Sequence, residues 1–339
     1  MSSAALLAVD GGATKTDLAL VGVDGSLLAL ERGPLSSPHY LGLDGSLDVL
    51  ADLLDRAGTT ADVPTDDGPV TELGQLLMAG VDLPSEVRDF HEAVRARGWS
   101  TRTIVDNDTF AILRAGTEQG WGVAVVCGTG INCVGIAPDG RHARFPALGA
   151  ITGDWGGGWD VGLAAVSAAA RSEDGRGRKT TLEESVPAYF GLSTPTELAE
   201  AIHHGQIAQK RIGELPRVVF ADAATDEVAA AIVAHLADEV VALARVALER
   251  LDLTHQPVEI LLGGGLLRPG NGTLEVAIET GLREVGDAIT VRNTESPPIV
   301  GAALLGLDEL GAGVEAQERV RRQLDEAVAA LEPEWPADG

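Results

Sequence analysis

The residues with the clearest chemical potential lie in a glycine turn near the N-terminus, at positions 10–16 with the sequence DGGATKT. Glycines let backbone N–H groups approach phosphate oxygens. The hydroxyls of Thr14 and Thr16 are further donors, and the Asp10 carboxylate can face a hydrated Mg²⁺. The turn joins two apolar segments that are expected to pair as antiparallel strands, whereas a P-loop precedes a helix. The segment fits either a phosphate-binding turn or an ordinary glycine hairpin.

Two later glycine segments also follow apolar strands. Residues 127–130, with the sequence CGTG, end the apolar run 121–127 and mirror the first turn. Two such turns could hold the two ends of a triphosphate. Residues 263–265 are three glycines after the predicted strand 258–262, at the strand end where α/β proteins bind ligands. This segment suits an adenine ring, and it equally suits a close crossing of strand and helix.

Two polar segments could act on a substrate. Residues 106–108, with the sequence DND, follow the predicted strand 103–105 and precede a helix from Phe110. A carboxylate there could orient a substrate hydroxyl and accept its proton, although Asp108 also fits a helix N-cap. The glycine-rich segment 153–160 could place Asp154 on sugar hydroxyls and a tryptophan face on a sugar ring, or it could be a hairpin with packed tryptophans.

These residues must be positioned by alternating strands and helices. The pattern predicts strands at 5–10, 17–22 and 26–31, a helix at 46–57, a surface loop at 58–70, a strand at 76–79 and a helix at 86–97. The strand order restarts near Trp121, with strands 121–127 and 131–137, which indicates an internal duplication. Beyond these lie predicted helices at 163–171, 182–189, 196–203 and 226–251, a strand at 289–293, and helices at 298–307 and 316–331.

Composition excludes some classes of function. The chain has 339 residues, which suggests two domains, and its net charge of -26 disfavours nucleic acid and anionic membranes as partners. No apolar run approaches the roughly 20 residues of a membrane span, and no basic segment precedes Ala4, so we expect no signal peptide. Cys127 and Cys133 form no metal motif. Two cysteines in this length suit a reducing cytoplasm, so we expect a cytoplasmic protein.

The order and spacing of these motifs resemble the actin/hexokinase/Hsp70 ATPase superfamily. Within it, the chain is similar to the N-acetylglucosamine kinase branch of the BadF/BadG/BcrA/BcrD ATPase family, over residues 5–310. The resemblance implies an α/β fold of two RNase H-like domains with a nucleotide cleft between them, ATP and Mg²⁺ as cofactors, and a homodimer. The expected domains are 1–117, on which the helix 316–331 would pack, and 118–312 with a helical insertion.

The resemblance also implies roles for individual residues. Asp108 would be the catalytic carboxylate and Asp10 would hold Mg²⁺ through water. The expected sugar contacts at positions that match the family are Asn107, Asp108, Asn132 and Asp154. His39 and Trp155 are expected sugar contacts on their residue types alone, and each equally fits a packing role. The expected ATP contacts are Gly11, Gly12, Thr14, Lys15, Thr16, Gly128, Thr129, Gly130, Gly263, Gly264 and Gly265.

The chain departs from the family pattern at three places around the sugar. Pro38 stands where the sugar kinases commonly carry an asparagine, and Trp155 replaces a glutamate. Leu148-Gly149 stands where the animal enzymes have Trp-Gly near the acetamide pocket. The expected function is therefore an ATP-dependent kinase that phosphorylates a hydroxyl, O6, of an amino sugar such as N-acetylglucosamine or glucosamine, and an unrelated hydroxylated substrate remains open.

Two other functions are consistent with such a chain. The first is an ATPase that drives a conformational or redox partner, as in dehydratase activators, which hold an iron–sulfur cluster on cysteines. Cys127 and Cys133 lie in predicted buried strands, which argues against cluster ligation. The second is a catalytically silent sugar sensor, which the presence of Asp10, Asp108 and both glycine turns disfavours.

Overall fold

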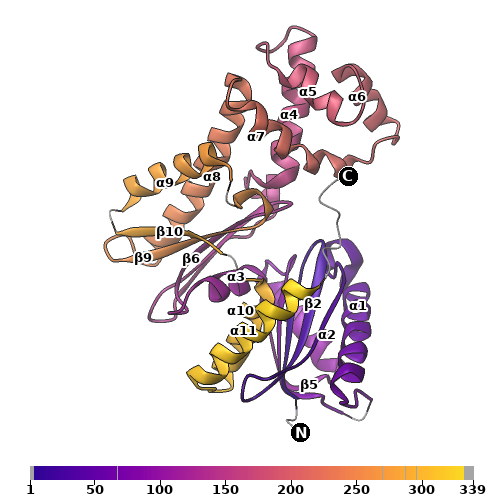
Figure 1. Ribbon diagram of the computed structural model, residues 1–339, viewed down its shortest axis with the longest axis vertical. Coiled ribbons are helices and arrows are strands. Elements are labelled where there is room, and N and C mark those ends of the chain that lie inside the picture. The colour runs from indigo at the N-terminus through magenta and orange to yellow at the C-terminus, as the bar shows by residue number, and fades with distance from the viewer. Residues whose placement is uncertain (1–3, 67, 269, 287, 295, 332–339) are drawn as a thin grey trace. The chain divides into compact units, whose positions relative to one another are not determined.

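The computed structural model describes residues 4–66, 68–268, 270–286, 288–294 and 296–331. It divides into two compact units (Figure 1), the first formed by the chain up to Trp121 and from Thr294 onward, the second by Gly122–Asn293. Each unit contains one five-stranded sheet covered by helices. Among the helices in the described part of the chain, none has the length and apolar character that a membrane crossing requires.

The sheet of the first unit has the order β3-β2-β1-β4-β5. Its strands are β1 (Ala4–Gly11), β2 (Lys15–Gly22), β3 (Leu27–Pro34), β4 (Thr71–Met78) and β5 (Ser100–Asn107). The DGGATKT turn joins β1 to the antiparallel β2, as the sequence predicts. Strands β4 and β5 run parallel to β1. The carboxyl ends of these three strands therefore lie at one edge of the sheet, which is where α/β proteins place their ligands.

Helices cover both faces of this sheet because the side chains of β1 alternate between them. Leu7 and Val9 belong to a buried cluster that includes Leu50 and Leu53 of α1 (Pro38–Ala61). The helix begins at Pro38 rather than at residue 46, because proline pre-sets the helical φ in a first turn and Gly42, with φ 69°, forms a kink within it. The remaining helices of this unit are α2 (Pro84–Arg97), α3 (Thr109–Gly116), α10 (Pro298–Glu309) and α11 (Val314–Ala330).

The expected domain boundary differs from the structure at the C-terminal end. The expected second domain, 118–312, includes helix α10, but this helix packs in the first unit against α3, β1 and β4. Two glycines permit this. A Cβ at Gly301 would lie 1.8 Å from the Ala111 carbonyl oxygen, and one at Gly306 would lie 2.3 Å from the Leu6 side chain. The chain thus returns to the first unit after Asn293 instead of ending in the second.

The sheet of the second unit repeats the first topology, with the order β10-β9-β6-β7-β8. Strands β6 (Gly122–Cys127), β7 (Ile131–Ile136) and β8 (His142–Arg144) form an antiparallel meander, and β9 (Val258–Gly263) and β10 (Ile289–Asn293) run parallel to β6. In both units the first strand is central, its hairpin partner lies on one side and a parallel strand on the other. The duplication expected from sequence is confirmed in this order of strands.

Helices α4 (Gly157–Glu173), α5 (Leu182–Tyr189), α6 (Pro195–His203), α7 (Pro216–Asp222), α8 (Glu227–Arg250) and α9 (Gly272–Val285) belong to the second unit. Helix α4 begins at Gly157, not at residue 163, so half of the expected glycine loop is its first turn. Helix α9 was not anticipated, although Asn271 caps it and Leu274, Ile278 and Leu282 follow helical spacing.

Candidate active site

The first glycine turn is shaped by close packing. A Cβ at Gly11 would lie 2.4 Å from the Met78 side chain, and one at Gly12 would lie 2.7 Å from the Lys15 carbonyl oxygen. The N–H of Gly12 donates to that same carbonyl at 2.9 Å. A side chain at Gly12 would therefore meet fixed backbone, whereas one at Gly11 would require the Met78 side chain to move. The Gly12 amide is engaged within the turn. Any phosphate contact here must come from other donors at the tip.

The polar side chains of this turn point in different directions. The Thr16 hydroxyl is fully buried and lies 2.7 Å from both the Pro34 carbonyl oxygen and Ser36 Oγ. Thr14 is exposed at the tip of the turn. Lys15 is partly exposed, and its Nζ contacts Asp17 Oδ2 at 2.8 Å. Thr14 and Lys15 are thus the side chains of the turn that solvent can reach.

Three carboxylates lie near one another at the end of β1. Asp17 is buried and binds Arg32 through both oxygens, at 2.6 Å from Nε and 2.9 Å from Nη2. Asp10 is only 7% exposed. Burial, followed by the negative charges of Asp17 and Asp108, raises the pKa of Asp10 to about 8. Lys15 and Arg32, both bonded to Asp17, oppose this shift without cancelling it. A desolvated carboxyl beside two other carboxylates is an environment that favours a bound cation.

Asp108 follows β5 and stands at the N-cap position of α3, but its side chain makes no capping hydrogen bond. The capping alternative is therefore not what the structure shows. Burial raises the pKa of Asp108 to about 7, and the negative charge of the neighbouring Asp82 is the second cause. Hydrogen bonds from the backbone amides of residues 108 and 109 act in the opposite direction. A carboxyl with this pKa can exchange a proton near neutrality.

Asn107 turns into the protein. It is 3% exposed, its Nδ2 donates to Asp82 Oδ1 at 2.7 Å, and its Oδ1 accepts from the Thr109 N–H at 3.0 Å. Its side chain thus links the end of β5, the loop after β4 and the start of α3.

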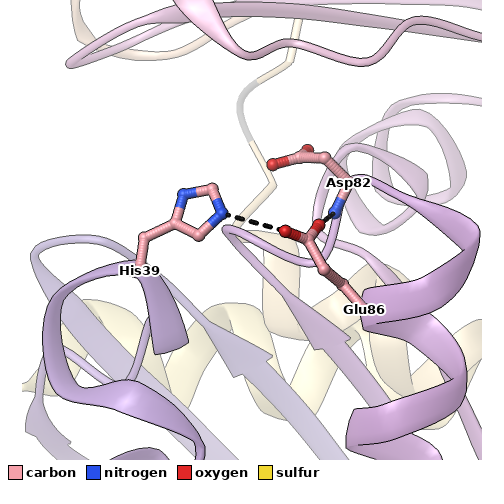
Figure 2. A group of neighbouring side chains, drawn as sticks. All are labelled: His39, Asp82 and Glu86. Atoms are coloured by element: carbon pink, nitrogen blue, oxygen red, sulfur yellow. Dashed lines mark hydrogen bonds and ion pairs between the residues drawn. The ribbon is translucent and has the colours of Figure 1, made fainter.

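Sequence reasoning missed two carboxylates at the same edge. Figure 2 shows Asp82, from the loop before α2, and Glu86, from the first turn of α2, beside His39 at the start of α1. Glu86 Oε1 lies 3.5 Å from His39 Nε2, and its Oε2 accepts from the N–H groups of Asp82 and Leu83 at 2.9 and 2.8 Å. The ligand atoms of these three residues lie within 4.8 Å of one another. The signal for Asp82 was weaker than that for Asp108, because β4 ends at Met78, several residues before Asp82, whereas Asp108 directly follows β5.

The second glycine turn, between β6 and β7, is open on its outer side. A Cβ at Gly128 or Gly130 would meet nothing within 4 Å. The inner side is bonded to the start of α4, where the N–H of Gly158 donates to the Gly128 carbonyl at 2.8 Å and that of Trp159 to the Thr129 carbonyl at 3.3 Å. The first amides of α4 therefore hold the turn, and its outer surface is left accessible.

Three further candidates from the sequence lie around this turn. Asn132 follows it on β7, and its Oδ1 accepts from the Cys133 N–H at 2.7 Å. Asp154 is partly exposed and accepts a hydrogen bond from the Thr152 hydroxyl. Trp155 stacks on His235 of α8, with ring centroids 4.2 Å apart. The structure thus gives Asp154 and Trp155 different neighbours although they are adjacent in sequence.

The triple glycine lies beside the second turn because β9 pairs with β6, with Gly263 opposite Val126. Gly264 has φ 87°, and a Cβ there would lie 2.3 Å from the Cys127 carbonyl oxygen. A Cβ at Gly265 would meet nothing within 4 Å. Gly264 therefore serves the close crossing, whereas Gly265 leaves space at the surface.

Both cysteines are inaccessible. Cys127 ends β6 and accepts a hydrogen bond from the Gly157 N–H at 3.1 Å, and Cys133 lies in β7. Burial raises the pKa of each thiol well above its usual range. Neither is placed to ligate a cluster at the surface of its unit.

Two sheets with the same strand order, each with a glycine turn after its central first strand, define a duplicated actin-like ATPase fold. The chain belongs to the BadF/BadG/BcrA/BcrD ATPase family, whose model matches residues 7–306.

The chain is also similar to two curated sugar kinases. It is 29% identical to the N-acetylmuramic acid/N-acetylglucosamine kinase of Clostridium acetobutylicum, over 77% of this chain and 85% of that protein. It is 24% identical to the N-acetyl-D-glucosamine kinase of Dictyostelium discoideum, over 91% of this chain and 99% of that protein.

Solved structures share the fold. A provisionally named N-acetylglucosamine kinase from Chromobacterium violaceum has a TM-score of 0.71 at 24% identity, covering 90% of this chain and 100% of that one. A ROK hexokinase from Thermus thermophilus has a TM-score of 0.51 at 19% identity, covering 91% and 99%. These likenesses bear on the fold alone.

Proposed function

We propose that this protein is an ATP-dependent kinase that phosphorylates O6 of an amino sugar. The observation that carries the proposal is Asp108, a carboxylate at the strand edge of the first unit that does not cap its helix and has a pKa raised to about 7. The names of the curated relatives support the substrate class, since both are N-acetylglucosamine kinases by name.

Both glycine turns are proposed to contact phosphate. In the first unit, Thr14 and Lys15 are the accessible side chains, and Thr16 supports the turn from within. In the second unit, Gly128, Thr129 and Gly130 offer an open outer surface, and the space at Gly265 suits the adenine. Gly11, Gly12, Gly263 and Gly264 shape the backbone around these contacts.

Asp10 is the residue proposed to hold Mg²⁺ through water. Burial, followed by the charges of Asp17 and Asp108, raises the pKa of its carboxyl. The two cations that oppose this shift, Lys15 and Arg32, are bonded to Asp17. This environment fits a divalent ion, which oxygen ligands bind and which also keeps several of its waters. The bound ion would neutralise charge on the β- and γ-phosphates.

Asp108 is proposed to orient the sugar hydroxyl and to take its proton. The hydroxyl oxygen forms a bond to the γ-phosphorus, the bond from that phosphorus to the β-phosphate oxygen breaks, and ADP leaves. Because the transition state is loose, alignment contributes more than proton abstraction. Asp154, Asn132 and His39 are proposed sugar contacts.

The test is ADP release by the purified full-length protein with Mg-ATP against single sugars. Glucosamine, N-acetylglucosamine, N-acetylmannosamine, N-acetylmuramic acid, glucose and a sugar-free control form the panel. A large stimulation by an amino sugar supports the proposal and identifies the substrate, and phosphorus–proton correlation NMR of the product locates the phosphate. ATP hydrolysis that no sugar stimulates would favour an ATPase with a protein partner instead.

A further inference from the structure

A groove in the second unit lies between α4 and α8, apart from the two glycine turns. Its volume is about 470 Å³, within the roughly 300–1,000 Å³ of small-molecule sites. Ala164 and Ala168 of α4 and Ile232 of α8 line it. The two helices are in contact and lie side by side in Figure 1. Small residues at helical spacing thus leave an apolar floor between them.

The two ends of the groove differ in chemistry. At one end Trp155 and His235 stack, with centroids 4.2 Å apart and planes inclined by 36°. At the other end are Arg171 and Arg178, near the start of α8 at Val228. Val228 and His235 are seven residues apart on α8, which is about 10 Å at the helical rise of 1.5 Å per residue. An aromatic end and a basic end are therefore separated by about that distance.

The basic end is unusual for this chain. The net charge is -26, yet none of the residues that line the groove within the described part of the chain is acidic. Arg178 pairs with Glu227 outside the groove, where that side chain is 80% exposed. Arg171 donates to the neutral Arg176 carbonyl oxygen at 3.0 Å, and the nearby Asp174 carboxylate forms its ion pair with Arg176, at 2.7 Å, rather than with Arg171. Guanidinium groups favour phosphate, which they can bind through two hydrogen bonds.

We propose that this groove is a second ligand site, which binds an aromatic anion of the size of a nucleoside monophosphate. The aromatic ring lies against Trp155 and His235, and the phosphate lies at Arg171 and Arg178. Aromatic stacking on tryptophan tolerates different bases, so selectivity is for the ring-and-phosphate combination. The site shares no residue with the two proposed phosphate turns.

The groove is connected to the second glycine turn through the backbone. Trp155 directly precedes Gly156–Trp159, and within this stretch the N–H groups of Gly158 and Trp159 donate to carbonyls of the turn. A Cβ at Gly157 would lie 2.5 Å from the Thr129 carbonyl oxygen, so the two segments are in direct contact. A ligand that immobilises Trp155 therefore restrains residues 155–159 and, through them, the turn.

The experiment is calorimetric titration of the full-length protein with AMP, in the presence of a saturating non-hydrolysable ATP analogue that occupies any ATP site. Adenosine, ribose 5-phosphate and inorganic phosphate are separate arms. We expect AMP to bind at least tenfold more tightly than each of these. Arg171→Gln should weaken AMP binding at least tenfold, whereas Arg245→Gln, which removes an arginine of α8 outside the groove, should not change it. Hydrogen exchange of residues 155–159 should slow on AMP binding.

Three results would overturn the site. In the first, AMP does not bind. In the second, AMP binds but the ATP analogue abolishes its binding, and in the third Arg171→Gln leaves AMP binding unchanged. If Arg171→Glu converts a dimer to a monomer in sedimentation while AMP never binds, the groove is a contact between copies. Failure of the ATP analogue itself to bind contradicts the proposed kinase function and leaves the AMP titration interpretable.

Discussion

The side-chain amide of Asn107 donates to Oδ1 of Asp82 at 2.7 Å, and this bond ties the end of β5 to the loop after β4. Because Asn107 also accepts from the Thr109 N–H, one buried side chain fixes two segments that carry the carboxylates Asp82 and Asp108. We therefore propose that Asn107 positions these carboxylates. Its amide is engaged inside the protein, so a direct contact with sugar is the weaker assignment.

Removal of the Asp108 carboxylate should abolish most of the kinase activity. Asp108→Ala is expected to lower kcat by roughly 10²–10⁴-fold, the range for loss of a general base, with sugar binding retained. Steady-state kinetics and calorimetric sugar titration measure the two effects.

The matched control is Asp106→Asn in the same DND triplet. The Asp106 carboxylate accepts from the Asn107 N–H, so this variant tests the triplet's local structure without touching the proposed base. A loss of activity in Asp106→Asn as large as in Asp108→Ala, or near-normal turnover in Asp108→Ala, would contradict the assignment.

The pH profile should report Asp108. Its pKa is raised to about 7, and a base must be deprotonated, so log kcat/KM should rise with pH until about 7 and then level off. Asp82→Asn removes the second cause of the shift and should move this acidic limb to lower pH. Burial, the larger cause, remains, so the limb should stay above the ordinary aspartate value of 3.8. An unmoved limb would mean that Asp82 does not act on Asp108.

The strand pattern and the glycine turns could be predicted from sequence because both are local. Two continuous apolar runs joined by a DGG turn define the hairpin of β1 and β2 without reference to the rest of the chain. The order of such hairpins then indicates the duplicated fold. Asp108 could be placed because it directly follows a strand.

What could not be predicted depends on contacts between distant segments. The start of α4 at Gly157 is fixed by hydrogen bonds to the turn at 128–130, and the return of α10 to the first unit depends on its contact with α3 through Gly301. The motif likewise does not predict that the Thr16 hydroxyl is buried against Ser36. Local spacing identifies the residues that could bind a ligand or take part in catalysis, and tertiary contacts decide which of them are exposed to solvent.

The pH dependence of stability should report Asp10. Its folded-state pKa of about 8 lies above the ordinary value of 3.8, so the folded state binds the extra proton between these values. The contribution of this proton to the free energy of unfolding is fully present below the pKa that Asp10 has in the unfolded state. It is lost as the pH rises through the folded-state value of about 8. In magnesium-free buffer, Tm should therefore fall between pH 5 and 8, and the fall should be smaller in Asp10→Asn.

Magnesium distinguishes this carboxyl from the other acids of the chain. At pH 8, Mg²⁺ should raise Tm of the wild-type protein, because a ligand that binds the folded state stabilises it, and should have little effect on Asp10→Asn. Asp24→Asn is the control, since Asp24 is an exposed carboxylate paired with Arg319. Equal magnesium effects in all three proteins would show that the ion does not depend on Asp10.

The triple glycine offers a pair of substitutions that separate structure from nucleotide binding. Gly264→Ala places a methyl group 2.3 Å from the Cys127 carbonyl oxygen at a φ of 87°. We expect it to lower the free energy of unfolding by roughly 2–4 kcal/mol, from backbone strain and overpacking together. Chemical denaturation measures this loss.

Gly265→Ala changes the neighbouring residue, where a Cβ meets nothing within 4 Å, so the free energy of unfolding should be nearly unchanged. If the adenine lies against this backbone, the added methyl displaces the ring, and KM for ATP should rise roughly tenfold, equivalent to about 1.4 kcal/mol. KM for the sugar should change less than KM for ATP, because the proposed sugar contacts lie on other segments, Asn132 on β7 and Asp154 before α4. An unaltered KM for ATP in a stable Gly265→Ala protein would place the adenine elsewhere and leave the three glycines with a structural role alone.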